Sequence, residues 1–248
     1  MQLGANTPAV ISGGASGLGA AVASGLRELG VPVGIIDLKD SADGHAFAQA
    51  DITDHEAVKA ALDALRAANG QERICVNCAG IATGAKTVSR GEPHDPELFA
   101  RTININLIGT FNVASQSAAG MASADSLNDD KERGVIINTA SIAAFDGAIG
   151  QIAYAASKAG VAGMTLPMAR DLTQAGIRVM TIAPGIFKTP MVTGMTQDLQ
   201  DALASNIPFP SRLGDPSEFA RLVRHIAENA MLNGETIRLD GATRLTAK

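Results

Sequence analysis

The chain of 248 residues lacks tryptophan, contains one tyrosine and two cysteines, and is only 3% aromatic, so its core must be mainly aliphatic. The two cysteines, Cys75 and Cys78, exclude a framework of disulfides and are typical of a reducing compartment. The formal net charge is −5, so there is no basic surplus to attract nucleic acid or an acidic membrane surface.

A long hydrophobic run and a leader-like start are also missing. The most apolar window, residues 149–169, contains Lys158 and Pro167, which disfavours a transmembrane helix. Residues 1–4 lack the basic and then apolar profile of a secretory signal. We therefore expect a soluble, cytoplasmic protein with no membrane partner. A chain of this length can bury roughly 70–75% of its unfolded surface, so it needs no disulfide or metal to fold.

Short apolar runs alternate with longer stretches in which apolar residues recur every three or four positions. The expected strands are residues 9–12, 32–37, 46–50, 74–77, 135–140, 178–183 and 236–239, and the expected helices are residues 17–29, 55–68, 96–121, 151–174 and 216–229. Most of these strands are continuously apolar, as in a sheet that is covered on both faces. The alternation predicts the α/β fold class, with a doubly wound parallel sheet and helices on both faces. There is no linker or repeat, so we expect one domain over residues 1–248.

Polar residues mark the ends of several elements. Asp54 and Asp215 precede expected helices and are typical N-caps, and Pro216 suits the first helical position. Two polar stretches, residues 82–95 and 122–133, are expected to be surface loops.

A glycine-rich turn follows the first expected strand and contains Gly13, Ser16, Gly17, Leu18 and Gly19. Backbone N–H groups at the start of a helix can bind a dinucleotide pyrophosphate if no Cβ intervenes, and the helix dipole adds a partial positive charge there. Glycines alone are a weak signal, but their place between a strand and an amphipathic helix favours a nucleotide site. The turn has no Gly-Lys-Ser/Thr, which disfavours a P-loop for nucleoside triphosphates.

An acidic residue, Asp37, ends the second expected strand, 18 residues after Gly19. A carboxylate at this position can accept both adenosine-ribose hydroxyls and repels a 2′-phosphate, which favours NAD over NADP. Lys39, two residues further on, leaves some use of NADP open.

The third and fourth expected strands end in further candidates for the cofactor site: Asp51 and Ile52, then Cys78, Ala79 and Gly80. In a parallel sheet these ends meet at the edge where a ligand crosses.

The two cysteines form a C-x-x-C pattern that a redox pair or half of a zinc site would also show. Cys75 and Cys78 are three positions apart on a strand, so they should point to opposite faces. There is no second pair, and the four histidines are scattered. We therefore expect no metal site.

The only tyrosine, Tyr154, lies four residues before Lys158, on one face of an expected helix. A free phenol has a pKa near 10 and is a poor base, but a nearby ammonium favours the phenolate. Ser141 ends the fifth expected strand and is placed to donate a hydrogen bond to a substrate oxygen. Together these three residues indicate acid–base chemistry on a bound alcohol or ketone.

These motifs in this order resemble the short-chain dehydrogenase/reductase family over essentially the whole chain. The resemblance rests on the glycine turn, Asn77-Cys78-Ala79-Gly80, Asn106, Ser141, Tyr154-x3-Lys158 and Pro184-Gly185. It implies a single-domain Rossmann fold with a seven-stranded sheet, and a homotetramer. It also implies a catalytic tetrad: Tyr154 is the acid and base, Lys158 contacts the nicotinamide ribose, Ser141 orients the substrate, and Asn106 holds a proton-relay water.

Longer segments, among them residues 134–141, 208–216 and 233–241, are similar to the type 2 3-hydroxyacyl-CoA dehydrogenase branch of this family. That branch implies NAD-dependent oxidation of an L-3-hydroxyacyl-CoA, a small-molecule substrate, to the 3-ketoacyl-CoA. Two alternatives remain. One is another short-chain dehydrogenase, such as a 3-oxoacyl thioester reductase or a dehydrogenase of hydroxysteroids or other secondary alcohols. The other is a non-catalytic nucleotide-binding scaffold.

The substrate side of the site is expected after the sixth strand. Pro184, Phe187 and Thr189 should frame the nicotinamide, and Gln151, one turn before Tyr154, is a candidate for the substrate. Residues 186–214 are expected to cover the substrate. Within them, residues 190–209 carry spaced apolar side chains, including Met191 and Met195, which suit a mobile lid over an acyl chain. The alternative is that this apolar stripe packs on the core or on a neighbouring subunit.

Overall fold

The centre of the protein is a parallel sheet of seven strands in the order β3-β2-β1-β4-β7-β8-β9. The computed structural model describes residues 1–40 and 44–246, except for the side chain of Met191. The strands are β1 (Ala9–Ser12), β2 (Val33–Asp37), β3 (Ala46–Gln49), β4 (Ile74–Asn77), β7 (Gly134–Thr139), β8 (Ile177–Pro184) and β9 (Thr236–Leu239). The chain leaves β1 toward one side of the sheet and returns to β4 on the other. The strand order therefore reverses between β1 and β4, which is where sheets of this kind bind ligands.

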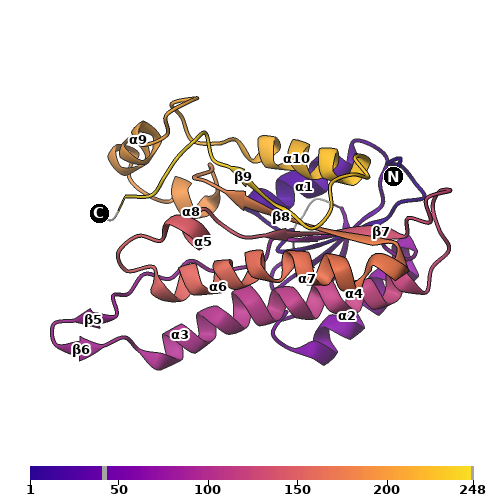
Figure 1. Ribbon diagram of the computed structural model, residues 1–248, viewed down its shortest axis with the longest axis horizontal. Coiled ribbons are helices and arrows are strands. Elements are labelled where there is room, and N and C mark those ends of the chain that lie inside the picture. The colour runs from indigo at the N-terminus through magenta and orange to yellow at the C-terminus, as the bar shows by residue number, and fades with distance from the viewer. Residues whose placement is uncertain (41–43, 247–248) are drawn as a thin grey trace.

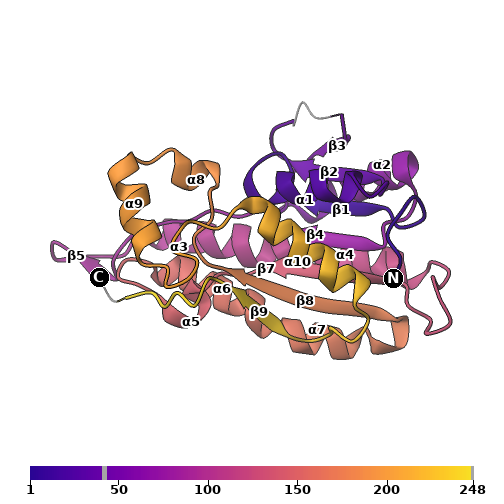
Figure 2. The same ribbon diagram turned by 90° about the horizontal axis from the view of Figure 1, so that it is seen from above.

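Helices cover both faces of this sheet (Figures 1 and 2). On one face lie α1 (Gly17–Arg27) and α10 (Pro216–Glu228), and on the other lie α2 (His55–Asn69), α4 (Thr110–Ala122), α6 (Ile152–Gly163) and α7 (Thr165–Asp171). The shorter helical segments are α3 (Pro96–Ile103), η1 (Asn104–Gly109), α5 (Ala143–Asp146), η2 (Thr173–Ala175), α8 (Pro190–Thr193) and α9 (Gln197–Ser205). The predicted α/β Rossmann fold, with seven parallel strands and helices on both faces, is confirmed.

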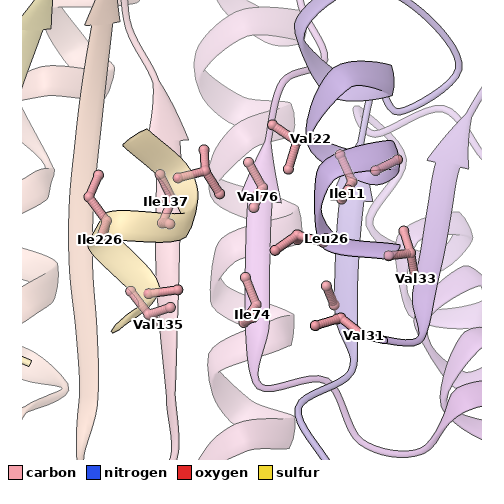
Figure 3. Close-up of a cluster of buried hydrophobic side chains, with 14 of the residues drawn as sticks. Ile11, Val22, Leu26, Val31, Val33, Ile74, Val76, Val135, Ile137 and Ile226 are labelled. Atoms are coloured by element: carbon pink, nitrogen blue, oxygen red, sulfur yellow. The ribbon is translucent and has the colours of Figure 1, made fainter. Parts of the chain in front are cut away.

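Two aliphatic clusters form the core, one on each face of the sheet. Figure 3 shows part of the first, to which Leu26 of α1, Ile137 of β7 and Ile226 of α10 belong. Val10 and Ile136 belong to the second cluster, on the face covered by α2, α4 and α7. Successive strand residues point to opposite faces, and both faces are covered, so most positions of the central strands are apolar. Each such side chain contributes roughly 1.5–3 kcal/mol when it leaves water.

Two helices begin at the predicted aspartate N-caps. The Asp54 side chain accepts a hydrogen bond from the Glu56 backbone N–H at 2.9 Å. The Asp215 side chain accepts one from Ser217 at 2.9 Å, and the Glu218 carboxylate accepts the Asp215 N–H at 2.8 Å. These reciprocal bonds form a capping box, which satisfies backbone donors that the helix leaves unpaired.

The helix predicted over residues 96–121 is observed over residues 96–122, but its middle is not α-helical. It consists of α3, the π-helical segment η1 and α4. Within η1 the Asn106 side chain bonds to the backbone N–H and C=O of Ile81, which lies 25 residues earlier in the chain. Such insertions of a wider turn are common at functional sites.

The helix predicted over residues 151–174 is also wrong as a single element. It divides at Met164 into α6 and α7. Pro167 has no N–H with which to continue the hydrogen-bond ladder across this point, so the break has a local cause. The other predicted boundaries differ from the observed ones by at most two residues.

The two predicted surface loops differ in structure. Residues 82–95 contain a short antiparallel pair, β5 (Val88–Ser89) and β6 (Glu92–Pro93), which projects from one end of the molecule (Figure 1). Residues 123–133 contain no helix or strand, as predicted, but Glu132 is buried and pairs with Arg178 at 3.0 Å.

Candidate active site

A cavity of about 1160 Å³ lies at the carboxyl edge of the sheet. Every predicted site residue except Asn106 lines it: Gly13, Ser16, Gly17, Leu18, Gly19, Asp37, Asp51, Ile52, Cys78, Ala79, Gly80, Ser141, Gln151, Tyr154, Lys158, Pro184, Phe187 and Thr189. These residues are far apart in the sequence, but most of them follow the ends of parallel strands. The topology therefore brings them to one edge.

The glycine turn lies at the end of β1 and is packed too tightly for side chains at two positions. Gly13 has φ +71°, and a Cβ on it would lie 2.5 Å from the Ala79 nitrogen. A Cβ on Gly19 would lie 2.2 Å from the Gly13 carbonyl oxygen. Helix α1 can start this close to the turn only because both residues are glycine, and the backbone of the turn lines the cavity without a side chain over it.

Asp37 ends β2 with its carboxylate held in place by backbone donors. One oxygen accepts from Leu38 at 2.7 Å and from Lys39 at 3.3 Å, and the other accepts from Ala15 of the glycine turn at 3.1 Å. A carboxylate offers about four lone-pair sites, so acceptor capacity remains for ribose hydroxyls. The position and charge of Asp37 fit the adenosine end of a dinucleotide.

Tyr154 and Lys158 project from α6 toward the segment that follows β7. Lys158 is 5% exposed, and its Nζ donates to the Thr139 carbonyl oxygen at 2.8 Å and lies 5.9 Å from the centre of the Tyr154 ring. The buried Ser141 lies beside them, with its hydroxyl accepting the Ala143 N–H at 3.1 Å. The predicted acid–base group, cation and hydroxyl are therefore together at one wall of the cavity.

Burial shifts the two ionisable groups in opposite directions. It lowers the pKa of Lys158 to about 8, because the buried ammonium has lost most of its water. It raises the pKa of Tyr154, and the interaction of the phenol with Ser141 opposes this rise only in part. We expected Lys158 to lower the Tyr154 pKa, and this expectation is wrong for the structure, in which burial dominates.

Asn106 differs from the prediction in its surroundings. It is fully buried and is not among the residues that line the cavity. Its side chain accepts from Ile81 at 2.8 Å and donates to Ile81 at 2.9 Å and to the Ser157 hydroxyl at 3.0 Å. The side-chain amide thus holds η1, the segment after Gly80 and α6 together, and the proton-relay water stays a prediction.

The segment after β8 lines the part of the cavity where the nicotinamide is predicted to bind. Phe187 is buried and packs edge-to-face on Phe219, with the ring centres 6.4 Å apart. Thr189 faces the glycine turn, since a Cβ on Gly17 would lie 3.5 Å from it. Across the cavity, Gln151 accepts a hydrogen bond from its own turn, leaving it half-buried at the wall.

The predicted cover, residues 186–214, forms α8, α9 and their connections. Val192, Met195 and Leu203 line the cavity, whereas Leu199 and Phe209 are exposed. One side of this segment therefore faces the cavity, and its movement as a lid stays a prediction.

Sequence reasoning missed several residues of the cavity wall. Glu97, Arg101 and Asn104 reach it from α3 and η1, and Leu245 reaches it from the segment after β9. The first three share one helix face by their spacing, which was a usable signal. No sequence motif around Leu245 indicates a role in the site, because only the path of the folded chain brings this residue to the cavity.

The cysteines are free thiols on opposite faces of the sheet, as predicted: Cys75 packs in the second core cluster and Cys78 against the first. Burial raises the pKa of Cys75 to about 12 and that of Cys78 to about 11, so both thiols stay protonated. Within residues 1–40 and 44–246, no three His, Cys, Asp or Glu side chains are grouped so as to hold a metal ion. In the same part of the chain, no helix has the length and apolarity needed to cross a membrane.

Comparison with known proteins agrees with this geometry. Residues 7–200 match the family model described as short chain dehydrogenase. The chain is 52% identical to the 3-hydroxyacyl-CoA dehydrogenase type-2 of Bos taurus, covering 96% of this chain and 95% of the relative. It is 50% identical to the protein of that name from Drosophila melanogaster, covering 97% and 98%. The crystal structure of 3-hydroxyacyl-CoA dehydrogenase type-2 from Mycobacterium avium is 44% identical, with a TM-score of 0.92 over 98% of this chain and 97% of that one.

These relatives are oxidoreductases, and they imply a nicotinamide cofactor and a small-molecule substrate. The residues present fit such a cofactor: the uncovered backbone of the glycine turn suits a pyrophosphate, and the Asp37 carboxylate suits a ribose. The fold, the cavity and the sequence matches lead to the same conclusion: the chain belongs to the short-chain dehydrogenase family.

Proposed function

We propose that this protein is an NAD-dependent dehydrogenase that oxidises an L-3-hydroxyacyl-CoA to the 3-ketoacyl-CoA. The observation that carries the proposal is the grouping of Tyr154, Lys158 and Ser141 in one cavity with the glycine turn and Asp37. Two relatives named 3-hydroxyacyl-CoA dehydrogenase type-2, at 52% and 50% identity over nearly their whole length, support the substrate class.

Each residue has a distinct task in this reaction. Ser141 donates a hydrogen bond to the substrate hydroxyl oxygen and orients it toward Tyr154. The Tyr154 phenolate takes the hydroxyl proton, and the buried Lys158 ammonium lies beside it, 5.9 Å from the centre of the ring. Asn106 positions α6 through Ser157. The bound nicotinamide supplies the redox chemistry, by taking up the hydride that leaves the carbinol carbon.

The preference for NAD is assigned to Asp37. Its carboxylate is fixed by three backbone N–H groups, so it cannot turn away from a 2′-phosphate without breaking those bonds. The charge repulsion and the loss of the ribose hydrogen bonds then act together against NADP. Lys39 is exposed beside it and provides the only cation close in sequence.

The chain is proposed to act as one NAD-binding domain, residues 1–248, in which residues 186–214 cover the substrate. Met195 and Leu203 support this, because they extend from the cover into the cavity. Gln151 is proposed to contact the substrate from the opposite side.

A homotetramer is proposed as the assembled form. Exposed apolar side chains occur along neighbouring helices, with Ile108 and Phe111 on η1 and α4, Ile152 on α6 and Leu166 on α7. Another copy of the chain would remove these side chains from water. A cytoplasmic location is supported by the two free thiols.

The decisive experiment is a comparison of kcat/KM for 3-hydroxyacyl-CoAs of several chain lengths with kcat/KM for free secondary alcohols, each with NAD and with NADP. The proposal requires the CoA thioesters with NAD to be the best pair. Equal rates with and without the CoA portion would instead indicate a general secondary-alcohol dehydrogenase.

A Tyr154→Phe variant tests the chemistry separately. Loss of the phenolic oxygen should lower turnover by about 10²- to 10⁴-fold, the usual contribution of a positioned acid or base. NAD binding, followed by isothermal titration calorimetry, should be nearly unchanged. Full activity in this variant would refute the mechanism, and intact NAD binding without turnover in the wild type would favour a non-catalytic scaffold.

A further inference from the structure

Arg238, on the edge strand β9, joins three parts of the chain although it does not line the cavity. Its guanidinium donates to both carboxylate oxygens of Asp146, with one N–O distance of 3.2 Å. Its Nε donates to Asp240 at 2.7 Å and one terminal nitrogen donates to the Thr243 carbonyl at 2.9 Å. The guanidinium also lies 5.5 Å from the centre of the Phe145 ring. Arg238 is thus bonded to α5 and to the segment after β9 at the same time.

The first of these parts, α5, is attached directly to the wall that carries Ser141. Ser141, Ile142 and Ala143 all line the cavity. The Ala143 N–H donates to the Ser141 hydroxyl at 3.1 Å, and the Asp146 N–H donates to the Ile142 carbonyl at 3.0 Å. A shift of Asp146 would therefore be transmitted to the hydroxyl that faces the substrate.

The second part is the segment after β9, which reaches the cavity at Leu245. Figures 1 and 2 show it passing between α9 and α5. Asp240 is 7% exposed and is held by Arg238, while Leu245 lines the cavity. The Leu245 backbone N–H also faces the Asp146 carboxylate, and the Arg238 hydrogen bond together with this N–H holds the Asp146 pKa below its ordinary value.

The same segment touches the base of the proposed substrate cover. The Gly241 carbonyl accepts the Phe209 N–H at 3.3 Å. A Cβ on Gly241 would lie 2.7 Å from the Ile207 side chain. Leu245 and the cover are therefore two walls of the cavity that share one support.

This network differs from an ordinary surface ion pair. Arg238 and Asp146 are 21% and 18% exposed, and the guanidinium makes bidentate bonds in a fixed plane, which lysine cannot reproduce. Exposed pairs such as Arg224–Glu228, at 51% and 40% exposure, lack these constraints.

We propose that Arg238 is a positioning residue that sets acyl-chain selectivity, because its bonds to Asp146 and Asp240 hold Leu245 against the wall that carries Ser141. The proposal rests on the proposed function. It adds that Leu245, held in place by Arg238, determines which acyl-chain lengths the site accepts. Arg238 acts through Leu245 and does not touch the reacting atoms.

The test compares kcat/KM for 3-hydroxybutyryl-CoA and 3-hydroxyoctanoyl-CoA in the wild type, Arg238→Lys, Asp146→Asn and Leu245→Ala. The ratio between the two substrates should change by about tenfold in each variant, the effect of losing one or two apolar contacts in a pocket. The KM for NAD should stay within about twofold, since the Arg238 guanidinium bonds to Asp146, Asp240 and Thr243 and not to the glycine turn or Asp37. Arg224→Lys is the matched control and should leave the ratio unchanged.

A double variant separates positioning from stability. If Arg238 acts through Leu245, Arg238→Lys combined with Leu245→Ala changes the ratio no more than Leu245→Ala alone. A lower Tm with an unchanged substrate ratio overturns the role of Arg238. If Arg238→Lys does not fold, the nearly isosteric Asp146→Asn variant decides by the same ratio. A wild type that turns over neither thioester overturns the proposed function itself, which is a different result from an active wild type whose variants keep its ratio.

Discussion

Ser157 offers a sharp test of the packing behind the catalytic helix. It is fully buried in α6, between Tyr154 and Lys158 in sequence. Its hydroxyl donates to the Tyr154 carbonyl at 2.7 Å and accepts from the Asn106 side-chain nitrogen at 3.0 Å. Replacement by alanine removes one oxygen and leaves the helix and its apolar contacts in place.

The cost of Ser157→Ala follows from the groups that are left behind. One hydrogen of the Asn106 amide loses its partner in a buried site, which costs about 1–3 kcal/mol. Alanine has a higher helix propensity than serine, which offsets up to about 0.5 kcal/mol. The expected net loss is about 2 kcal/mol of the free energy of unfolding. For a chain of this size that loss lowers Tm by roughly 4–8 °C, at 2–4 °C per kcal/mol.

Ser205→Ala is the matched control. Its hydroxyl donates to the carbonyl three residues earlier, Ala202, at 2.8 Å, as Ser157 does to Tyr154, but Ser205 is exposed in α9. Its loss should change the free energy of unfolding by less than about 0.5 kcal/mol. Thermal and urea unfolding at one protein concentration measure both variants. Equal stabilities of the two variants would refute the role assigned to the bond between Ser157 and Asn106.

Three further predictions use other contacts. Gly19→Ala should fold poorly or lose NAD binding, because its Cβ would lie 2.2 Å from a backbone carbonyl oxygen. Gly25→Ala in the same helix should leave stability unchanged or raise it by up to about 1 kcal/mol. Unfolding curves and NAD titrations of the two variants check this. Asp37→Ser should lower kcat/KM with NAD by about 10- to 100-fold and raise it with NADP, and an unchanged ratio between the cofactors would contradict the role of the carboxylate. The rate of alcohol oxidation should rise with pH through about 8, and Lys158→Ala should remove that step from the profile.

Much of the fold was predictable because helices cover the sheet on both sides. Strands that are buried on both faces are apolar at most positions, so β1, β4 and β7 are visible as short apolar runs that end in the buried polar residues Ser12, Asn77 and Asn138. The π-helical turn in one long helix and the break in the other were less visible. Pro167 was a local signal for the break at Met164, but η1 depends on the bonds from Asn106 to Ile81, which is distant in sequence.

The cofactor side of the site was predictable for a topological reason. Parallel strands end at the same edge, so Asp37 and Cys78 could be assigned to one cavity from their places after apolar runs. Leu245 and Glu132 could not be placed in this way. Glu132 stands in a charged run that looks like solvated loop, and its burial follows from Arg178, 46 residues later.

The pKa values of the site connect its burial with the direction of its reaction. Burial of the ammonium lowers the pKa of Lys158 to about 8, whereas burial raises the pKa of Tyr154, so the proton of Lys158 is the first that the pair loses as the pH rises. Below this pH the pair is phenol and ammonium, which can give a proton but not take one. Above it, one of the two singly protonated forms is phenolate and ammonium, which is the form that accepts the proton of an alcohol. Oxidation should therefore rise through about pH 8 and ketone reduction should fall through the same pH. A profile for oxidation that is flat from pH 6 to 10, measured as kcat/KM, would show that this pair does not carry the proton.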